Sequence, residues 1–233
     1  MNPIMTSNPQ VISNLTLRRA VGILGISFPV ILVTGSMISG MCHEVQSSIS
    51  IYYHTGMRDV FIGVLCILAM FLFAYKGYDR RDAIAGKLGC LFVLGIAFLP
   101  TSVTEHCNPC IIGGTNNEIL SSIHFFSAGA FFLVLSYFSI VSFTKGSDNP
   151  TRRKRVRNKL YRICGYAILG CTLLIAIYLC IFEKRVPALL QYHPVFWLES
   201  IALWAFGISW LTKGEAILRD MEENNPPLVP RKD

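Results

Sequence analysis

The stretch that decides the fold is AVGILGISFPVILVTGSMISG at residues 20–40, in which no side chain is charged. As an α-helix it would be about 31 Å long at about 1.5 Å per residue, which matches the hydrocarbon core of a bilayer. Similar segments recur along the chain, and the pattern shows none of the short alternating stretches of membrane β-strands. The six expected spans are Ala20–Gly40, Met57–Tyr75, Ile84–Ser102, Ile119–Phe143, Leu160–Phe182 and Pro194–Leu211. The sequence therefore predicts an all-α polytopic membrane protein, with six transmembrane helices in a bundle.

The overall composition agrees with a membrane class. Of the 233 residues, 52% are hydrophobic and only 15% are charged, whereas soluble domains carry about 25% charged residues. The net charge of +7 would suit a nucleic-acid-binding protein if it covered one folded surface. Here the cations lie in short loops between apolar segments, so we expect membrane lipids as partners and no nucleic acid.

The distribution of Lys and Arg predicts the orientation. If the N-terminus is cytoplasmic, the inner segments hold 18 of the 21 cations and the outer segments hold the rest, in agreement with the preference for cytoplasmic cations. The densest inner loop, KGSDNPTRRKRVRNK at residues 145–159, either contacts anionic headgroups or only fixes the topology, and we favour the second. We expect cytoplasmic tails at residues 1–17 and 216–233 around a transmembrane domain at residues 18–215.

In this orientation the histidines and several acidic residues gather on the outer side. Glu199 is the strongest candidate for a functional residue among them, because it lies inside the last apolar segment. An ionisable side chain at that depth should face a cavity or a partner instead of lipid. We expect that partner to be His124 or Arg58. The alternative is a buried hydrogen bond or ion pair that only holds two helices together.

A second candidate is the polar stretch SSISIYYHTGMRD at residues 47–59. His54, Arg58 and Asp59 are close enough in sequence to converge on an anionic headgroup. The alternative is that Asp59 stabilises the start of a helix and that the tyrosines anchor the interface. The complete set of candidate ligand-binding residues is His54, Arg58, Asp59, His124 and Glu199.

A third candidate is EHCNPC at residues 105–110. In an oxidising compartment Cys107 and Cys110 could form a local disulfide or cycle as a redox pair; with His106 and Glu105 they could also bind zinc. A structural zinc site normally shows a second pair of ligands at similar spacing, which is missing here. We therefore expect a local disulfide or free thiols. Zinc stays the weaker alternative.

Several stretches together resemble a known family. They are SSISIYYHTGMRDVFIG, AYKGYDRRD, FLPTS, IHFFSAGAFFLVLSYFS and FWLESIALWAFGISWLTKGE, which lie in this order between residues 47 and 215. The pattern resembles the bacterial membrane family called "domain of unknown function 998" and, more distantly, the six-helix Frag/DRAM-type membrane proteins. The resemblance covers about residues 20–215 and implies the six-helix arrangement and a bacterial inner (plasma) membrane. It implies no activity.

Our leading functional hypothesis is non-enzymatic. The bundle would bind a lipid headgroup or small ligand in an outward-facing polar pocket built from the five candidate residues. The rival is a membrane-embedded hydrolase acting on a lipid, with zinc held by histidines and with Glu199 or Asp59 as general base. A transporter is a weaker third option, because the sequence shows no inverted repeat.

Overall fold

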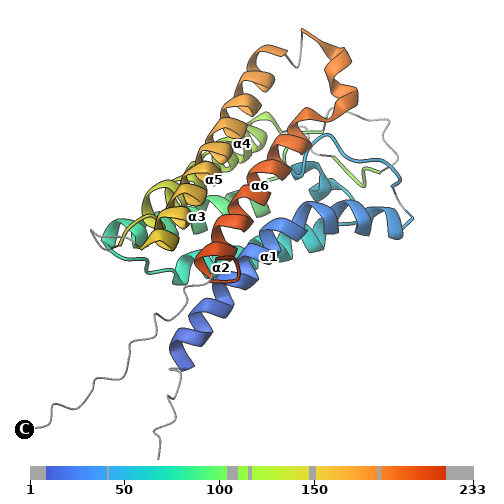
Figure 1. The fold of residues 1–233 in the computed structure, drawn as a ribbon. Coiled ribbons are helices and arrows are strands. Elements are labelled where there is room, and N and C mark those ends of the chain that lie inside the picture. Colours follow the sequence, from blue (N-terminus) through green and yellow to red (C-terminus); the bar gives the residue numbers. More distant parts are fainter. Residues whose placement is uncertain are drawn as a thin grey trace, which may run out of the picture.

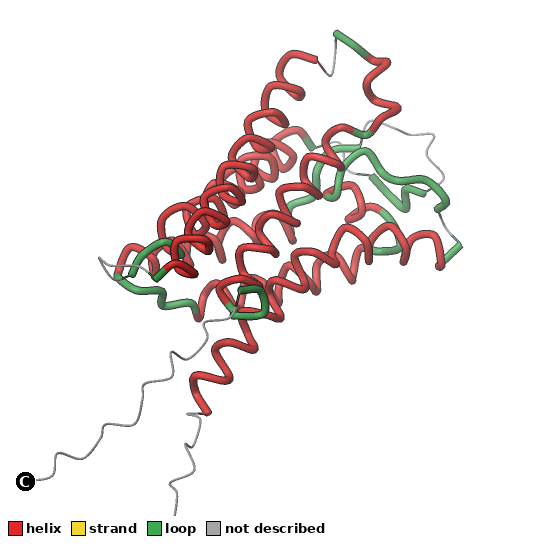
Figure 2. Tube along the Cα trace, viewed as in Figure 1, coloured by secondary structure: helices red, strands yellow, loops and turns green. Residues whose placement is uncertain are grey.

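The computed structural model describes residues 9–40, 42–103, 110–114, 117–146, 151–182 and 185–218. In these ranges the regular structure is helical and no strand occurs, as Figure 2 shows. Its α-helices are α1 (Pro9–Ile38), α2 (Arg58–Ala74), α3 (Arg80–Phe98), α4 (Glu118–Tyr137), α5 (Arg152–Ile177) and α6 (Pro194–Lys213). Single-turn 3₁₀ segments are η1 (Ser50–His54) and η4 (Pro187–Tyr192), and short π-helical segments are η2 (Phe138–Ser142) and η3 (Tyr178–Phe182). The all-α prediction is confirmed.

The helices form a closed ring. Each packs against the next along the chain, and α6 also packs against α1 (Figure 1). About three turns into α1, Arg19 Nε donates a hydrogen bond to Gly214 O at the end of α6, at 2.7 Å. Helix α1 therefore enters the bundle at the same end at which α6 leaves it.

Helices α1 and α6 approach each other closely because glycines face one another. A Cβ atom on Gly207 would lie 2.6 Å from the backbone oxygen of Gly22, and a Cβ atom on Gly22 would lie 2.7 Å from Leu211 Cγ. Small residues allow such backbone contact between membrane helices. The contact fixes the helix that carries Glu199 against the first helix of the chain.

Four helical segments are long and apolar enough to cross a membrane by length and composition: Asn14–Ile38, Glu118–Ser142, Arg152–Phe182 and Leu189–Lys213. The two remaining helices, α2 and α3, do not meet these criteria of length and composition. Helix α2 has only 17 residues, and α3 carries four charged side chains in its first eight residues. Large apolar side chains such as Met70 and Phe73 are 75% and 65% exposed, which suits contact with lipid. The fold thus fits a membrane protein.

The two ends of the ring differ in chemistry. One end holds the α1–α2, α3–α4 and α5–α6 connections, and we call it the disulfide end because Cys42 and Cys110 are bonded there. The other end holds the α2–α3 and α4–α5 connections and the start of α1, and we call it the cationic end because most Lys and Arg residues lie in these segments. Polar caps begin the helices at both ends. Asn117 Oδ1 accepts hydrogen bonds from the first amides of α4, and Asp79 Oδ1 accepts one from Asp82 N in α3.

The predicted local disulfide is corrected. Cys110 is bonded to Cys42, at a sequence separation of 68, because the α1–α2 and α3–α4 connections lie against each other. Cys110 therefore offers no thiolate for a zinc site with Cys107. The remaining residues of that motif, Glu105, His106 and Cys107, lie outside the described residues.

The structure describes part of the predicted N-terminal tail as helix. Helix α1 begins at Pro9, so its first two turns fall within the predicted tail of residues 1–17. Residues 1–8 and 219–233 lie outside the described part of the chain.

Candidate functional site

The polar stretch after α1 enters the disulfide end of the bundle. Its 3₁₀ turn η1 is enclosed by protein: Ile49, Ser50, Tyr52 and His54 are all buried. A segment this polar would be costly in lipid, because its backbone groups would lack partners. Here the surrounding helices and loops supply those partners, and the candidate residues provide several of them.

Glu199 holds this segment from α6. Its Oε2 accepts a hydrogen bond from Ile49 N at 2.6 Å, and the residue is only 8% exposed. One turn earlier in α6, Phe196 N donates to Ser47 O at 3.1 Å. The partner of Glu199 is therefore a backbone amide, instead of the His124 or Arg58 that the sequence suggested.

His124 holds the same segment from α4. Its Nδ1 lies 2.6 Å from Leu99 O, and its Nε2 lies 2.9 Å from Ser50 Oγ. A carbonyl oxygen can only accept, so Nδ1 donates and, in the neutral ring, Nε2 accepts from the Ser50 hydroxyl. No feature of the sequence distinguishes Ser50 from the neighbouring serines.

His54 connects the buried segment to the α3–α4 connection. Its Nε2 lies 2.8 Å from Thr101 O and its Nδ1 lies 3.0 Å from Gly113 O, while Ile112 N donates to His54 O at 2.7 Å. These bonds fasten the two connections that the disulfide also joins. His54 therefore connects the α1–α2 and α3–α4 loops by hydrogen bonds.

Arg58 and Asp59 do not join the other three candidates. Both are exposed at the start of α2. Arg58 Nη2 donates to the Tyr53 hydroxyl at 2.7 Å, and its guanidinium lies 4.5 Å from the centre of the Tyr53 ring. The structure therefore brings His54, His124 and Glu199 together around one buried segment and leaves the other two on the surface.

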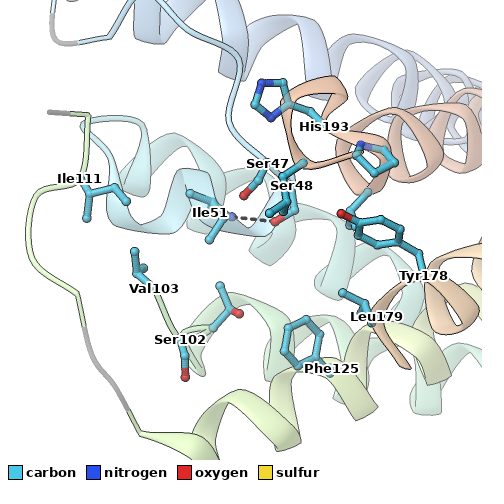
Figure 3. Close-up of a pocket in the computed structure, with 14 residues that line it drawn as sticks. Ser47, Ser48, Ile51, Ser102, Val103, Ile111, Phe125, Tyr178, Leu179 and His193 are labelled. Atoms are coloured by element: carbon cyan, nitrogen blue, oxygen red, sulfur yellow. Dashed lines mark hydrogen bonds between the residues drawn. The ribbon is translucent and has the colours of Figure 1, made fainter. Parts of the chain in front are cut away.

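A pocket of about 110 Å³ opens beside this segment (Figure 3). Its walls come from residues 47–51, the α3–α4 connection, helix α4, the α5–α6 connection and the start of α6. Hydroxyl groups and one imidazole supply its polar lining: Ser47, Ser48, Thr101, Ser102, Tyr178 and His193. Side chains including Phe125, Leu179 and Leu190 supply its apolar lining.

Two of the predicted residues, His54 and Glu199, do not line this pocket but hold residues of its walls. Glu199 holds Ile49, which lies between the lining residues Ser48 and Ile51, and His54 holds the carbonyl of the lining residue Thr101. Among the described residues, these candidates fix the walls while other side chains form the surface.

His193 is the most unusual lining residue. It has a left-handed backbone (φ 48°, ψ 52°) directly before Pro194 opens α6, a conformation that costs a non-glycine residue about 1–3 kcal/mol. Its Nδ1 is buried and has no hydrogen-bond partner among the described residues. Such strain persists only where the surroundings enforce it, and it clusters at functional sites.

Tyr178 enters the pocket from a second irregular element. It begins the π-helical segment η3 at the end of α5, and π-helical turns inside α-helices are frequent at functional sites. The sequence placed His193 on the outer side without selecting it for the site. No sequence signal marked Tyr178.

Within the described ranges, no group of three or more His, Cys, Asp or Glu side chains is placed to hold a metal ion. Both ring nitrogens of His54 and of His124 already face protein oxygens. The zinc-dependent hypothesis therefore gains no support from these histidines.

No protein-family model, curated protein or solved structure matches the chain. The geometry of the site therefore carries the functional proposal.

Proposed function

We propose that this protein is a six-helix integral membrane protein with both termini cytoplasmic, as the sequence predicts. Helix α2 at 17 residues is at the short end of the range for spanning helices, and the charges of α3 lie in the turns nearest the cationic end. The Cys42–Cys110 disulfide supports an oxidising compartment on the side opposite the cationic loops. Localisation in a bacterial inner membrane belongs to the same proposal and rests on the family resemblance.

We further propose that the pocket at the disulfide end binds a lipid headgroup or a small ligand of that size, without chemistry. The observation that carries this proposal is the buried Nδ1 of His193, which has no hydrogen-bond partner among the described residues. A buried polar atom without a partner costs about 1–3 kcal/mol. A ligand in the pocket toward which the His193 ring turns would hydrogen-bond to this nitrogen and remove that cost.

The mixed lining favours a lipid over a fully polar ligand. Hydroxyl groups line one part of the pocket and Phe125, Leu179 and Leu190 line another. Next to it, Tyr192 and Trp197 are exposed, as is common at the membrane interface. A headgroup could bind the hydroxyls while its glycerol and first methylenes contact the apolar part.

The test is native mass spectrometry of the protein purified in mild detergent, with the retained lipids identified. His193→Gly removes the imidazole and adopts the left-handed backbone without strain, and Tyr192→Phe is a matched control because Tyr192 is exposed and is not among the pocket's lining residues. We expect the wild type to retain a selected lipid class and His193→Gly to lower its occupancy about tenfold, the equivalent of one hydrogen bond. A wild type without selective lipid, or a variant with unchanged occupancy, would overturn the proposal.

One observation favours the hydrolase as a second candidate. The Ser50 hydroxyl donates to His124, whose other nitrogen is oriented by the Leu99 carbonyl, and a serine paired with an oriented base is the usual arrangement of an activated nucleophile. Ser50 and Glu199 also line a cavity of about 40 Å³ among apolar side chains. This version needs no metal. Lipid ester cleavage lost in Ser50→Ala, in a preparation freed of metal by chelation, would support it; lipid turnover that persists in that variant would exclude Ser50.

A further inference from the structure

A separate cavity lies at the cationic end, between α1 and α2. Its volume is about 390 Å³, and its lining includes Arg18 from α1 and Lys76 directly after α2. Leu17, Phe71 and Ala74 form its apolar wall. None of the described residues that line it is acidic, so its two cations face the cavity without a neighbouring carboxylate in the lining.

The side chain of Lys213 adds positive charge behind this cavity. It is 9% exposed, and its Nζ donates to the Tyr78 hydroxyl at 2.6 Å and lies over the rings of Tyr78 and Phe143. It forms no ion pair with any described carboxylate.

Two acids of this end, Asp79 and Asp82, pair with another cation. Lys145 Nζ bonds to Asp79 Oδ2 at 2.9 Å and to Asp82 Oδ1 at 2.6 Å. Asp82, which is fully buried, also accepts hydrogen bonds from Tyr78 N and from the Tyr137 hydroxyl. Within the described ranges, neither acid therefore forms an ion pair with Arg18, Lys76 or Lys213.

We propose that this cavity binds the phosphate of an anionic phospholipid from the leaflet at the cationic end, a site distinct from the pocket at the disulfide end. Arg18 and Lys76 would donate to the phosphate oxygens, since guanidinium and ammonium groups form strong charge-assisted bonds with phosphate. Lys213 would contribute its charge from behind. The acyl chains would follow the apolar wall toward the exposed Met70 and Phe73 of α2, which favours a lipid over free phosphate.

The experiment measures binding of a fluorescent phosphatidylglycerol to the purified full-length chain in a neutral detergent. The test variant is Arg18→Gln/Lys76→Gln. The matched control is Arg152→Gln/Arg155→Gln, which removes two exposed cations of the same end that are not among the cavity's lining residues. Competitors are unlabelled phosphatidylglycerol, phosphatidylcholine and inorganic phosphate.

We expect the test pair to weaken binding about 30-fold, at about fivefold for each juxtamembrane cation, and the control pair to weaken it less than twofold. Only unlabelled phosphatidylglycerol should compete at micromolar concentration. Equal losses in both pairs would indicate diffuse attraction and overturn the proposal; so would equal competition by phosphatidylcholine or by inorganic phosphate. If the double variant does not fold, Lys76→Gln alone decides, because Lys76 is exposed: about a fivefold loss supports the site and an unchanged affinity overturns it.

Discussion

Replacing Glu199 tests whether the buried segment is held as described. Glu199→Gln keeps a neutral acceptor for Ile49 N, whereas Glu199→Ala removes the acceptor. The bond is short, at 2.6 Å, and joins groups that solvent hardly reaches. The two variants therefore separate the presence of an acceptor from its charge.

The magnitudes follow from the type of bond. A hydrogen bond to a charged group contributes about 1.5–3 kcal/mol and a neutral one about 0.5–1.5 kcal/mol, so Gln should lower the free energy of unfolding by about 1 kcal/mol. Ala leaves Ile49 N without an acceptor and opens a cavity, so its cost should reach about 3 kcal/mol. Because Ile49 lies between two lining residues, Ala should also weaken ligand binding in the pocket at the disulfide end.

The assay is reversible unfolding in mixed micelles, followed by tryptophan fluorescence. Glu118→Gln is the matched control, because Glu118 is an exposed carboxylate at the same end of the bundle, and it should change stability by less than about 0.5 kcal/mol. Wild-type stability in Glu199→Ala would refute the reasoning, since it would mean that the amide finds another partner or that the segment is not buried. Equal losses in Gln and Ala would show that charge, and not acceptance alone, holds the segment.

Three further predictions concern a disulfide, a helix–helix contact and an ion pair that stabilise the bundle. Cys110→Ser should lower the unfolding free energy by up to about 4 kcal/mol, because the disulfide closes a loop across a sequence separation of 68; the same loss on reducing the wild type would confirm the cause, and an insensitive melt would contradict it. Gly207→Ala should cost about 1–3 kcal/mol, because its Cβ would lie 2.6 Å from a backbone oxygen, whereas Gly63→Ala, with open space around it, should be neutral or stabilising in the same unfolding assay. The hydrogen bond from Lys145 lowers the pKa of Asp79 below its ordinary value of 3.8, so the ion pair's contribution is present above that value and is lost as the pH falls through the lower folded-state pKa. The protection factors of the α2–α3 connection in hydrogen exchange should therefore stay unchanged down to about pH 4 and fall below it, whereas protection that is lost already at pH 6 would show that the pair does not hold the loop.

The helices could be predicted from the sequence because their signals are local. Apolar runs of the length of a bilayer predicted all six α-helices, and α6 begins at Pro194 as expected. Helix α1 extends to Pro9, beyond its apolar run, because a helix can continue past the stretch that lipid would cover. Hydropathy measures where lipid is tolerated, so it gives helix ends less precisely than helix centres.

The contacts of the site could be predicted only in part. The depth of Glu199 and His124 correctly indicated polar partners inside the bundle, but both partners come from the stretch at Ile49 and Ser50. Composition made that stretch look like a surface loop. Its burial depends on two connections meeting, as does the pairing of Cys42 with Cys110. Such contacts between distant parts of the chain leave no local pattern in a single sequence.

The pocket itself was the least predictable feature. Tyr178 and His193 line it from irregular backbone at the end of α5 and before α6. Neither the π-helical turn nor the left-handed residue has a residue signature here. The histidine was visible as one of several on that side, and only its geometry distinguishes it.

The central proposal is that a lipid headgroup enters the pocket at the disulfide end, and photo-crosslinking tests it most directly. A phospholipid with a photoactivatable diazirine in its headgroup would be added to the protein in vesicles, and the labelled peptides would be mapped by mass spectrometry. We predict labels on residues 47–51, 178–179 and 190–195, reduced about tenfold in His193→Gly. Labels confined to exposed side chains such as Met70 and Phe73, and unchanged in the variant, would contradict it.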